Sequence, residues 1–439
     1  MFSPSPATIP IAEPCKESRF PSLEQWLRWQ EGLHFTAIEL GLDRCRMVAE
    51  RMGLLAPAHT VVSIAGTNGK GSSAVMLDLI LRNAGYRVGR YTSPHLLRYN
   101  ERISVNGVDI SDALLCTSFQ KIDQARRDIS LTYFEFGTLA AMDIFAGSNL
   151  DVAILEVGLG GRLDAVNVLD ADVSLVTTID VDHELWLGYD RESIGREKAG
   201  IYRSGRPAVC GDPNAPASVA DTAAALGAKY IQCGTDFRYR KDGDSFAWFY
   251  GPRRMLGIPN PCHHHESQVQ NAAGVMTVLA ELGDRLPVSA EHVSAAMAEF
   301  RIPGRFQIIP GEIPVILDVA HNRQAGETLA ANLARLGNPG RNHIVVGMLR
   351  DKNHHGFYEQ IERHCDRLYL ATLRDERGTG AAELAESMRA AGSPKTALFD
   401  SVADAIDAAK AAAVAGDHIV VTGSFITIAA ALKCMNMQI

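Results

Sequence analysis

The chain of 439 residues has no uncharged apolar run of the roughly 18–20 residues that a membrane-spanning helix needs. Its eight cysteines stand singly, without a CxxC pair, so the sequence predicts neither a disulfide scaffold nor a cysteine metal site. Residues 1–20 carry four prolines and lack the basic start and apolar run of a secretory signal. We therefore expect free thiols, a cytoplasmic location and no membrane partner.

The chain also lacks a positive net charge. Its 43 Lys and Arg against 51 Asp and Glu give a net charge of −8, so no global basic field exists to hold a nucleic acid. An anionic protein that handles phosphates or carboxylates must use local devices, namely backbone N–H groups, a few placed cations or a metal ion.

Hydrophobic residues make up 46% of the chain, and short β-branched runs alternate with longer helical patterns. This alternation is typical of an α/β protein whose parallel sheets are covered by helices. The first unit is a strand at 60–65, a glycine-rich turn at 66–71 and a helix at 72–84. Further strands are predicted at 87–91, 151–157 and 172–179. The segment from about 205 to 262 is predicted to be irregular, with a small β-meander within it.

A second alternation begins near residue 314 and predicts five strands, each followed by a helix, as in a doubly wound module. These helices are predicted at 324–336, 354–365, 381–391, 402–415 and 426–433. The boundary is placed near 300–303, just before the turn Pro303-Gly304-Arg305. We therefore expect an N-terminal domain over 1–299 and a C-terminal domain over 300–439.

The strongest single motif is the turn Gly66-Thr67-Asn68-Gly69-Lys70-Gly71-Ser72 between a strand and a helix. Glycines let several N–H groups face one phosphate, Lys70 can reach the terminal phosphates, and Ser72 can hold Mg²⁺. Gly71 separates the lysine from the serine, unlike the common GxxxxGK[ST] spacing. The alternative is a tight glycine turn; the strand, lysine and serine favour phosphate binding.

Two other predicted strands end in polar side chains at the same sheet edge, where ligands of open α/β sheets collect. Glu156 ends one strand, and His183 follows the other, so both are candidate metal ligands beside Ser72. The structural alternative for each is a carboxylate that caps a loop or a histidine that bonds a backbone carbonyl.

Three further groups of residues have two interpretations each. Arg196 and Lys198 either neutralise charge in phosphoryl transfer or belong to a solvated helix end. The run 263–265 of three histidines is interpreted as a surface loop rather than a metal site. Asp318, with Arg305 upstream, either grips a nucleotide or small zwitterion or, with Asn322, caps the next helix.

The motifs together resemble those of the folylpolyglutamate synthase family, most closely its bacterial bifunctional dihydrofolate synthase/folylpolyglutamate synthase members within the Mur ligase superfamily. The matching blocks run from about residue 20 to the end and comprise AGTNGKGSS, TSPHL, NERI, LTYFEFGTLAA, EVGLGGRLDA, ESIGREKAGIYR, PGRFQ and DVAHN. The resemblance implies a P-loop, Mur-ligase-like N-terminal ATPase domain and a Rossmann-like C-terminal glutamate-ligase domain. It also implies ATP-dependent addition of L-glutamate to 7,8-dihydropteroate and to reduced folates through an acyl phosphate, by a protein expected to be a monomer.

The resemblance also implies roles for residues. Lys70, Lys198 and His321 would be catalytic, and Lys198 would be carbamylated and help to hold a second magnesium ion. The metal ligands would be Ser72, Glu156 and His183. ATP would be bound by Gly66, Thr67, Asn68, Gly69, Lys70, Gly71, Ser72, Ser73, Asn271, Arg305 and Asp318. Thr92, Ser93, Pro94, His95, Asp164 and His321 would bind the substrates, pterin and glutamate.

The chain departs from the family pattern at Val166, at Glu184-Leu185 and at Arg323. We expect activity to survive, because none of these positions falls on the P-loop, Glu156, His183 or Lys198. The alternatives are a monofunctional dihydrofolate synthase or folylpolyglutamate synthase, a different Mur ligase, or a P-loop nucleotide sensor without catalysis.

Overall fold

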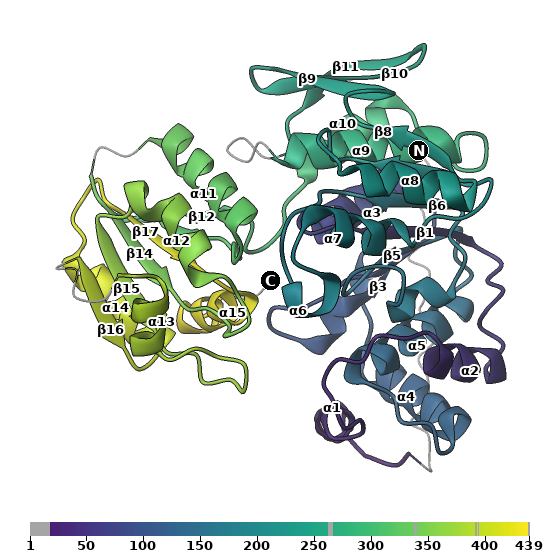
Figure 1. The fold of residues 1–439 in the computed structure, drawn as a ribbon, viewed down its shortest axis with the longest axis horizontal. Helices are drawn as coiled ribbons and strands as arrows, with labels where there is room; N and C mark the ends of the chain where they lie inside the picture. Colours follow the sequence, from purple (N-terminus) through teal and green to yellow (C-terminus); the bar gives the residue numbers. More distant parts are fainter. Residues whose placement is uncertain (1–17, 262–266, 338–339, 391–392, 394, 438–439) are drawn as a thin grey trace, which may run out of the picture.

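The chain forms two lobes, seen side by side in Figure 1, in a computed structural model that describes residues 18–261, 267–337, 340–390, 393 and 395–437. The N-terminal lobe is built on an eight-stranded sheet in the order β4-β3-β2-β5-β1-β6-β7-β8. Its strands are β1 (Thr60–Ala65), β2 (Val88–Tyr91), β3 (Ile103–Val105), β4 (Val108–Asp109), β5 (Val152–Glu156), β6 (Val173–Val176), β7 (Pro207–Cys210) and β8 (Lys229–Gln232). From β2 to β8 the neighbours pair in parallel, and β3 and β4 extend the sheet antiparallel.

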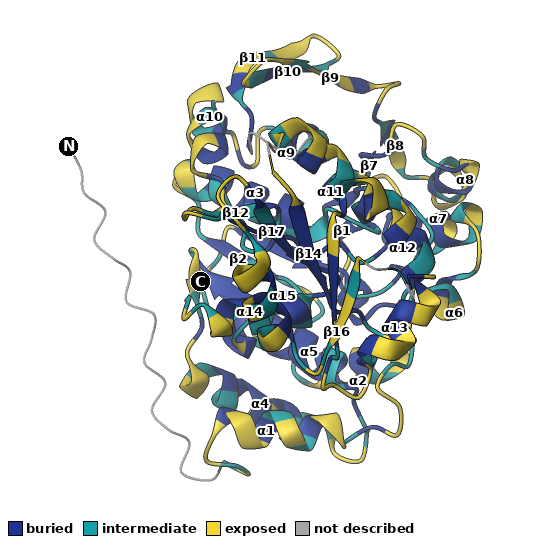
Figure 2. Ribbon diagram, turned by 90° about the vertical axis from the view of Figure 1, so that its left-hand side faces the viewer, coloured by how far each residue is buried: buried dark blue, intermediate teal, exposed yellow. Residues whose placement is uncertain are grey.

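Strand β1 shows why this sheet is covered on both faces. Its side chains alternate between two hydrophobic cores, with Val61 and Ala65 in one and Val62 and Ile64 in the other. A strand buried on both sides is largely apolar, which explains why four of the six residues of β1 are apolar, with Thr60 and Ser63 as the exceptions. Figure 2, which views the molecule from the side of the C-terminal lobe, shows buried strands at the centre and more exposed helices around them.

Helices α3, α9 and α10 pack against one face of the sheet, and the others cover the second face and the edge. Their bounds are α1 (Leu23–Glu31), α2 (Asp43–Arg51), α3 (Lys70–Asn83), α4 (Asp112–Arg126), α5 (Tyr133–Ala146), α6 (Glu184–Leu187), α7 (Arg191–Ala199), α8 (Ala217–Leu226), α9 (Ser267–Leu282) and α10 (Ala290–Glu299), with 3-10 turns η1 (Tyr99–Arg102) and η2 (Ala165–Val168). Every described helix is too short or too polar to cross a bilayer.

The predicted meander is confirmed as a separate three-stranded antiparallel sheet of β9 (Phe237–Asp242), β10 (Ser245–Tyr250) and β11 (Arg253–Pro259). It lies on α9, where buried Trp248 Nε1 donates a hydrogen bond of 3.1 Å to Thr277 Oγ1. The preceding residues 207–232 were included in the irregular segment, and that part of the prediction is wrong. They contribute β7, α8 and β8 to the main sheet and its cover.

The C-terminal lobe has a six-stranded sheet in the order β12-β13-β17-β14-β15-β16. Its strands are β12 (Gln307–Ile309), β13 (Val315–Leu317), β14 (Asn342–Val346), β15 (Arg367–Ala371), β16 (Thr396–Phe399) and β17 (His418–Thr422). The five predicted strand–helix units are confirmed, with helices α11 (Arg323–Leu336), α12 (His354–Ile361), η3 (Glu362–His364), α13 (Ala381–Ser387), α14 (Val402–Ala412) and α15 (Phe425–Cys434). The antiparallel edge strand β12 was not predicted.

A buried polar network stands at the amino end of β14. His343 bonds Tyr369 Oη through Nδ1 at 2.9 Å and Asp417 Oδ2 through Nε2 at 3.1 Å. The Asp417 carboxylate also accepts the backbone N–H groups of Arg341 and Val414. The network therefore ties the start of β14 to the turn before β17.

Candidate active site

Four neighbouring parallel strands deliver the candidate residues to one edge of the N-terminal sheet. In the strand register, Ile64 of β1 pairs with Glu156 of β5, and Ala65 pairs with Val176 of β6. Strand β2 lies on the other side of β5. The residues that follow these strands, namely 66–73, 92–95, 156–164 and 177–183, therefore share that edge.

The glycine-rich turn has a shape that side chains would block. Gly66 (φ 150°) and Gly69 (φ 89°) have positive φ values, and a Cβ at either would overlap a neighbour. At Gly66 the neighbour is Thr177 Oγ1, and at Gly69 it is the side-chain oxygen of Asn271. The turn thus requires glycine at both positions, because of the positive φ values and because a side chain would not fit. Asn271 of α9 lies directly against the turn at Gly69.

The polar side chains of the turn are mostly engaged with protein atoms. Lys70 Nζ donates to Gly66 O at 2.9 Å and to Thr67 O at 3.2 Å, and burial lowers its pKa. Ser72 Oγ accepts from Gln268 Nε2 at 3.2 Å. Ser73 Oγ is buried and has no hydrogen-bond partner within the described chain.

Glu156 is a buried carboxylate that faces the first turn of α3. Its Oε2 accepts the backbone N–H of Ser93 at 3.0 Å, and a Cβ on Gly71 would lie 3.4 Å from the same oxygen. Burial raises the pKa of Glu156, while Lys70 opposes that rise. A buried carboxylate beside the first turn of the helix that carries Ser72 is an oxygen donor suited to Mg²⁺.

Asp182 and His183 lie opposite the C-terminal lobe. Lys352 Nζ donates to Asp182 Oδ1 at 2.8 Å and approaches His183 Nε2 at 3.3 Å, so that nitrogen acts as the acceptor. Burial opposes ionisation of Asp182, but Lys352, His183 and His321 together hold its pKa well below its usual value. Burial lowers the pKa of His183 to about 4, so its imidazole is neutral at pH 7 and keeps a lone pair for a cation.

Asn68 of the glycine-rich turn contacts the C-terminal lobe directly. Its Nδ2 donates to Asn322 Oδ1 at 3.2 Å and to Gln324 Oε1 at 2.7 Å, and Thr178 Oγ1 also donates to Gln324, at 3.2 Å. Asn322 caps α11 by accepting the N–H of Ala325, so the capping interpretation is confirmed for this residue. The sequence analysis missed Gln324 and Lys352, although both follow a C-terminal-lobe strand, which is the signal that pointed to the other candidates.

Lys198 and Arg196 have different environments on α7. Arg196 is exposed, as in a solvated helix end, whereas Lys198 is buried. Burial first, and then the charge of Lys70, lower the pKa of Lys198 to about 7. Because its pKa is about 7, a large fraction of this group is a neutral amine near pH 7. Within the described residues the group makes no hydrogen bond or ion pair.

The loop after β2 and the turn after β5 are held by hydrogen bonds to backbone and side-chain atoms. Thr92 N donates to Arg102 O, and His95 Nδ1 accepts from Arg102 Nε at 2.9 Å. Pro94 stands between them in this loop. Asp164 accepts the N–H groups of Leu159 and Val166, and burial raises its pKa to about 7.

In the C-terminal lobe, Asp318, Arg305 and His321 lie around the segment that follows β13. Asp318 accepts two backbone N–H groups at 2.8 Å, and burial raises its pKa to about 6. The Arg305 guanidinium lies 5.3 Å from the ring centre of Phe425, near enough to Asp318 and Glu156 for both to favour its charge. His321 Nδ1 bonds Val319 O at 2.8 Å, so Nδ1 carries the proton and Nε2 is free to accept one.

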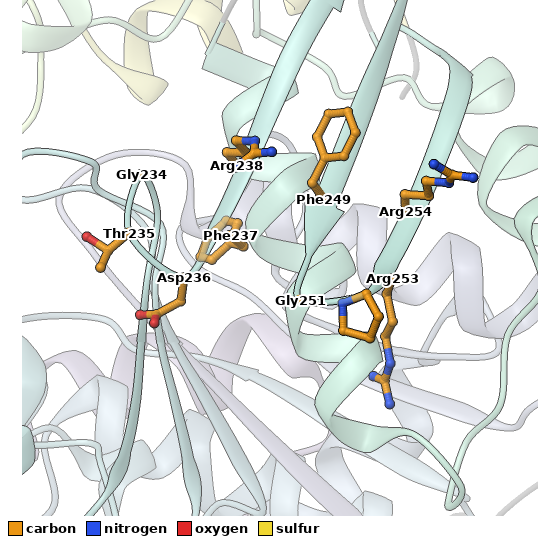
Figure 3. A pocket seen from close by; sticks show the side chains of 10 residues that line it. Gly234, Thr235, Asp236, Phe237, Arg238, Phe249, Gly251, Arg253 and Arg254 are labelled. Carbon is orange, nitrogen blue, oxygen red and sulfur yellow. The ribbon is translucent and has the colours of Figure 1, made fainter.

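A surface cavity of about 350 Å³ lies elsewhere, on the three-stranded sheet (Figure 3). Arg238, Phe249 and Arg254 line it from three strands, and none of the candidate residues does. The histidine run at 263–265 lies outside the described residues. No group of three or more His, Cys, Asp or Glu side chains in the described part of the chain forms a metal site by itself, so a metal ion here needs Ser72 or a substrate oxygen as well.

Comparisons of the sequence identify relatives over nearly the whole chain. The Mur ligase, glutamate ligase domain family matches residues 304–425. The dihydrofolate synthase/folylpolyglutamate synthase of Escherichia coli strain K12 is 45% identical over 95% of this chain and 96% of its own length. The protein of the same name from Haemophilus influenzae is 38% identical over 93% of this chain and 96% of its own length.

Solved structures share the fold at similar levels of identity. E. coli FolC in complex with DHPP and ADP superimposes with a TM-score of 0.90 at 44% identity, covering 94% of this chain and 98% of that one. The Yersinia pestis bifunctional folylpolyglutamate synthase/dihydrofolate synthase complexed with AMPPNP and Mn gives 0.89 at 43%, covering 96% and 100%. Similarity of this extent covers both lobes and the edge where the candidate residues gather.

Proposed function

The chain belongs to the dihydrofolate synthase/folylpolyglutamate synthase family, and on this premise we propose that it adds L-glutamate to 7,8-dihydropteroate and to reduced folates at the expense of ATP. It is an ATP-dependent amide-forming ligase of the Mur ligase type. The observation that carries the proposal is the convergence of the glycine-rich turn, Glu156 and His183 at one sheet edge that faces Asp318 and His321 of the glutamate ligase domain.

In the first step, a substrate carboxylate oxygen attacks the γ-phosphorus of ATP, the bond to the β,γ-bridging oxygen breaks, and ADP leaves an acyl phosphate behind. Two anions must approach each other, so the site has to offset their charge. We assign this to Lys70 and to the N–H groups of residues 66–73, with Asn271, Arg305 and Asp318 on the rest of the nucleotide. Lys70 would exchange its two loop carbonyls for phosphate oxygens.

Ser72, Glu156 and His183 would hold a magnesium ion, which supplies Lewis-acid neutralisation of phosphate charge when bound. The buried carboxylate and the neutral imidazole support this assignment. His183 Nε2 is the nitrogen that Lys352 contacts, so Lys352 Nζ would have to move away before this nitrogen could bind the ion.

Lys198 would be carbamylated. A neutral amine attacks CO₂, a C–N bond forms, one proton is released, and the neutral amine becomes a carbamate anion that would help to hold a second magnesium ion. The pKa near 7 supports this, because a neutral amine is the reactive form. A ¹³C carbamate signal after exposure to labelled bicarbonate, absent from Lys198→Arg, would test it; no signal in either protein would contradict it.

In the second step, the amino group of L-glutamate attacks the acyl carbon, the C–O bond to phosphate breaks, and the nitrogen loses one proton, which leaves the amide and inorganic phosphate. His321, with Nε2 unprotonated, would accept a hydrogen bond from that amino group. Thr92, Ser93, Pro94, His95 and Asp164 would line the pterin side. Contact between the two lobes would keep water from the acyl phosphate.

We propose that the protein acts as a monomer without a nucleic-acid partner, and its cytoplasmic location stays a prediction. The test measures phosphate release and product mass with Mg-ATP and L-glutamate, using 7,8-dihydropteroate in one reaction and tetrahydrofolate in the other. A gain of one or more glutamates in both supports both activities. A gain in only one would leave a monofunctional enzyme, and ATP binding without a gain in either would contradict ligation.

Lys70→Ala is the negative control for both reactions, because it removes the terminal-phosphate cation of the turn together with its two hydrogen bonds to the loop carbonyls. We expect it to abolish product in both tubes while the protein still folds. Retained turnover in this variant would contradict the role assigned to Lys70.

A further inference from the structure

Asp182 stands at the contact between the two lobes and receives three polar side chains from the C-terminal lobe. Lys352 Nζ lies 2.8 Å from Oδ1, while Asn322 Nδ2 and His321 Nε2 lie 3.0 and 3.7 Å from Oδ2. The side chains of Asp182 and Lys352 are only 10% and 6% exposed. The aspartate is thus a buried anion whose charge is balanced mainly from the opposite lobe.

The same C-terminal segment is bonded to the glycine-rich turn. Asn322 accepts from Asn68 and donates to Asp182, and Gln324 accepts from both Asn68 and Thr178. The turn and Asp182 are therefore tied to one short stretch at the start of α11. Of the described contacts that join Asp182 and the turn to the C-terminal lobe, only the one between Asp182 and Lys352 joins full charges of opposite sign.

A buried ion pair is sensitive to the loss of one partner, because the other charge is then left uncompensated away from water. Neutral amide pairs such as Asn68 with Asn322 can exchange one partner for water at much lower cost. Of the contacts across this face, the one between Asp182 and Lys352 is therefore the one on which the closed arrangement depends most strongly.

We propose that Asp182 is a positioning residue that holds the C-terminal lobe closed over the phosphate-binding turn through Lys352 and Asn322. His321 lies on the same segment as Asn322, so this contact sets where its Nε2 stands relative to the turn. The consequence for catalysis rests on the proposed function; the closure itself does not. Misplacement of a reacting group by about 1 Å can lower rates by about 100-fold, which is the loss in kcat/KM that we expect.

The test compares Asp182→Asn with Asp78→Asn as its matched control. Asp78 is also a buried aspartate with two cationic partners, but Arg82 and Arg90 both belong to the N-terminal lobe. Small-angle X-ray scattering of the full chain without ligands gives the radius of gyration, and thermal unfolding gives the stability of each variant. We expect a larger radius of gyration for Asp182→Asn than for wild type, and an unchanged one for Asp78→Asn.

Lys352→Gln and the double variant Asp182→Asn/Lys352→Gln address the same contact from the other side, in case one single variant does not fold. If the two residues act as a pair, the double variant opens no further than either single variant. An unchanged radius of gyration in Asp182→Asn and Lys352→Gln, or an equal increase in Asp78→Asn, would overturn the proposal.

Steady-state kinetics complete the experiment. We expect kcat/KM for L-glutamate to fall on the order of 100-fold in Asp182→Asn and to stay within a few-fold of wild type in Asp78→Asn. A wild-type protein without ligase activity would refute the proposed function, and the scattering comparison would still decide the role of Asp182. Equal kinetic losses in both variants would show a general effect of removing a buried charge and would contradict positioning.

Discussion

The glycine-rich turn offers a test in which steric overlap is separated from backbone strain. Gly69, just before α3, and Gly85, just after it, have φ values of 89° and 90°. A Cβ at Gly69 would overlap the Asn271 side chain, with Asn271 Cγ at 3.0 Å, whereas a Cβ at Gly85 would meet nothing within 4 Å. Gly69→Ala and Gly85→Ala therefore share the strain and differ in the overlap.

The expected magnitudes follow from this difference. A left-handed conformation costs an L-residue about 1–2 kcal/mol, and we expect Gly85→Ala to lose about that much free energy of unfolding. Overpacking adds about 1–3 kcal/mol, so Gly69→Ala should lose about 2–5 kcal/mol in total. The lower chain entropy of alanine in the unfolded state affects both variants alike and cancels in the comparison.

Thermal and denaturant unfolding measure the stability difference, and calorimetric titration with ADP measures nucleotide binding. We expect Gly85→Ala to bind ADP like wild type and Gly69→Ala to bind it at least about tenfold more weakly, which corresponds to about 1.4 kcal/mol. Adding Asn271→Ala to Gly69→Ala should recover stability, because the overlapping side chain is gone, but not nucleotide affinity. Equal losses of stability and affinity in Gly69→Ala and Gly85→Ala would refute the reasoning.

Three further outcomes are expected. Glu156→Gln should weaken Mn²⁺ binding by about tenfold or more, and equal affinity in a calorimetric titration would argue against a ligand role for this carboxylate. Trp248→Phe should lower the free energy of unfolding by about 1–3 kcal/mol, because it leaves buried Thr277 Oγ1 without its donor; a neutral result in denaturant unfolding would contradict this. Two backbone N–H groups, and then His343, hold the pKa of Asp417 at about 2, so its stabilising contribution is present above the ordinary value near 3.8 and is lost as the pH falls towards 2. The melting temperatures of wild type and Asp417→Asn should therefore converge over that range, and a constant gap would count against the assignment.

Most of the fold was predicted from local sequence patterns, namely apolar runs and glycine-rich turns. The mostly apolar, β-branched run at 60–65 marks a strand buried on both faces, and the turn at 66–71 is recognisable because its glycines permit conformations that other residues rarely adopt. The short edge strand β12 has three residues and only partly buried side chains, so it lacks the pattern that identified the others.

The sequence predicted those residues of the candidate site that lie at the ends of strands in the N-terminal sheet. Glu156 ends β5 and His183 follows β6, the strands on either side of β1, and the rule that ligands collect at this edge predicts that they lie close together. Lys352 is 170 residues away from Asp182 in the chain, and no periodicity encodes the docking of one lobe on the other. Similarly, the different burial of Arg196 and Lys198 depends on what packs against α7, which their spacing alone does not reveal.

The hydrogen bonds of Lys70 to the carbonyls of Gly66 and Thr67 have a consequence for how a nucleotide is received. The lysine already braces the turn from within, so the turn is preorganised and little conformational entropy remains to be lost when phosphate arrives. Binding is then an exchange of acceptors at one ammonium group rather than the capture of an anion by a free cation. Its affinity therefore depends on how much better a phosphate oxygen is than two backbone carbonyls, and that margin is wider for a dianionic terminal phosphate than for a neutral competitor.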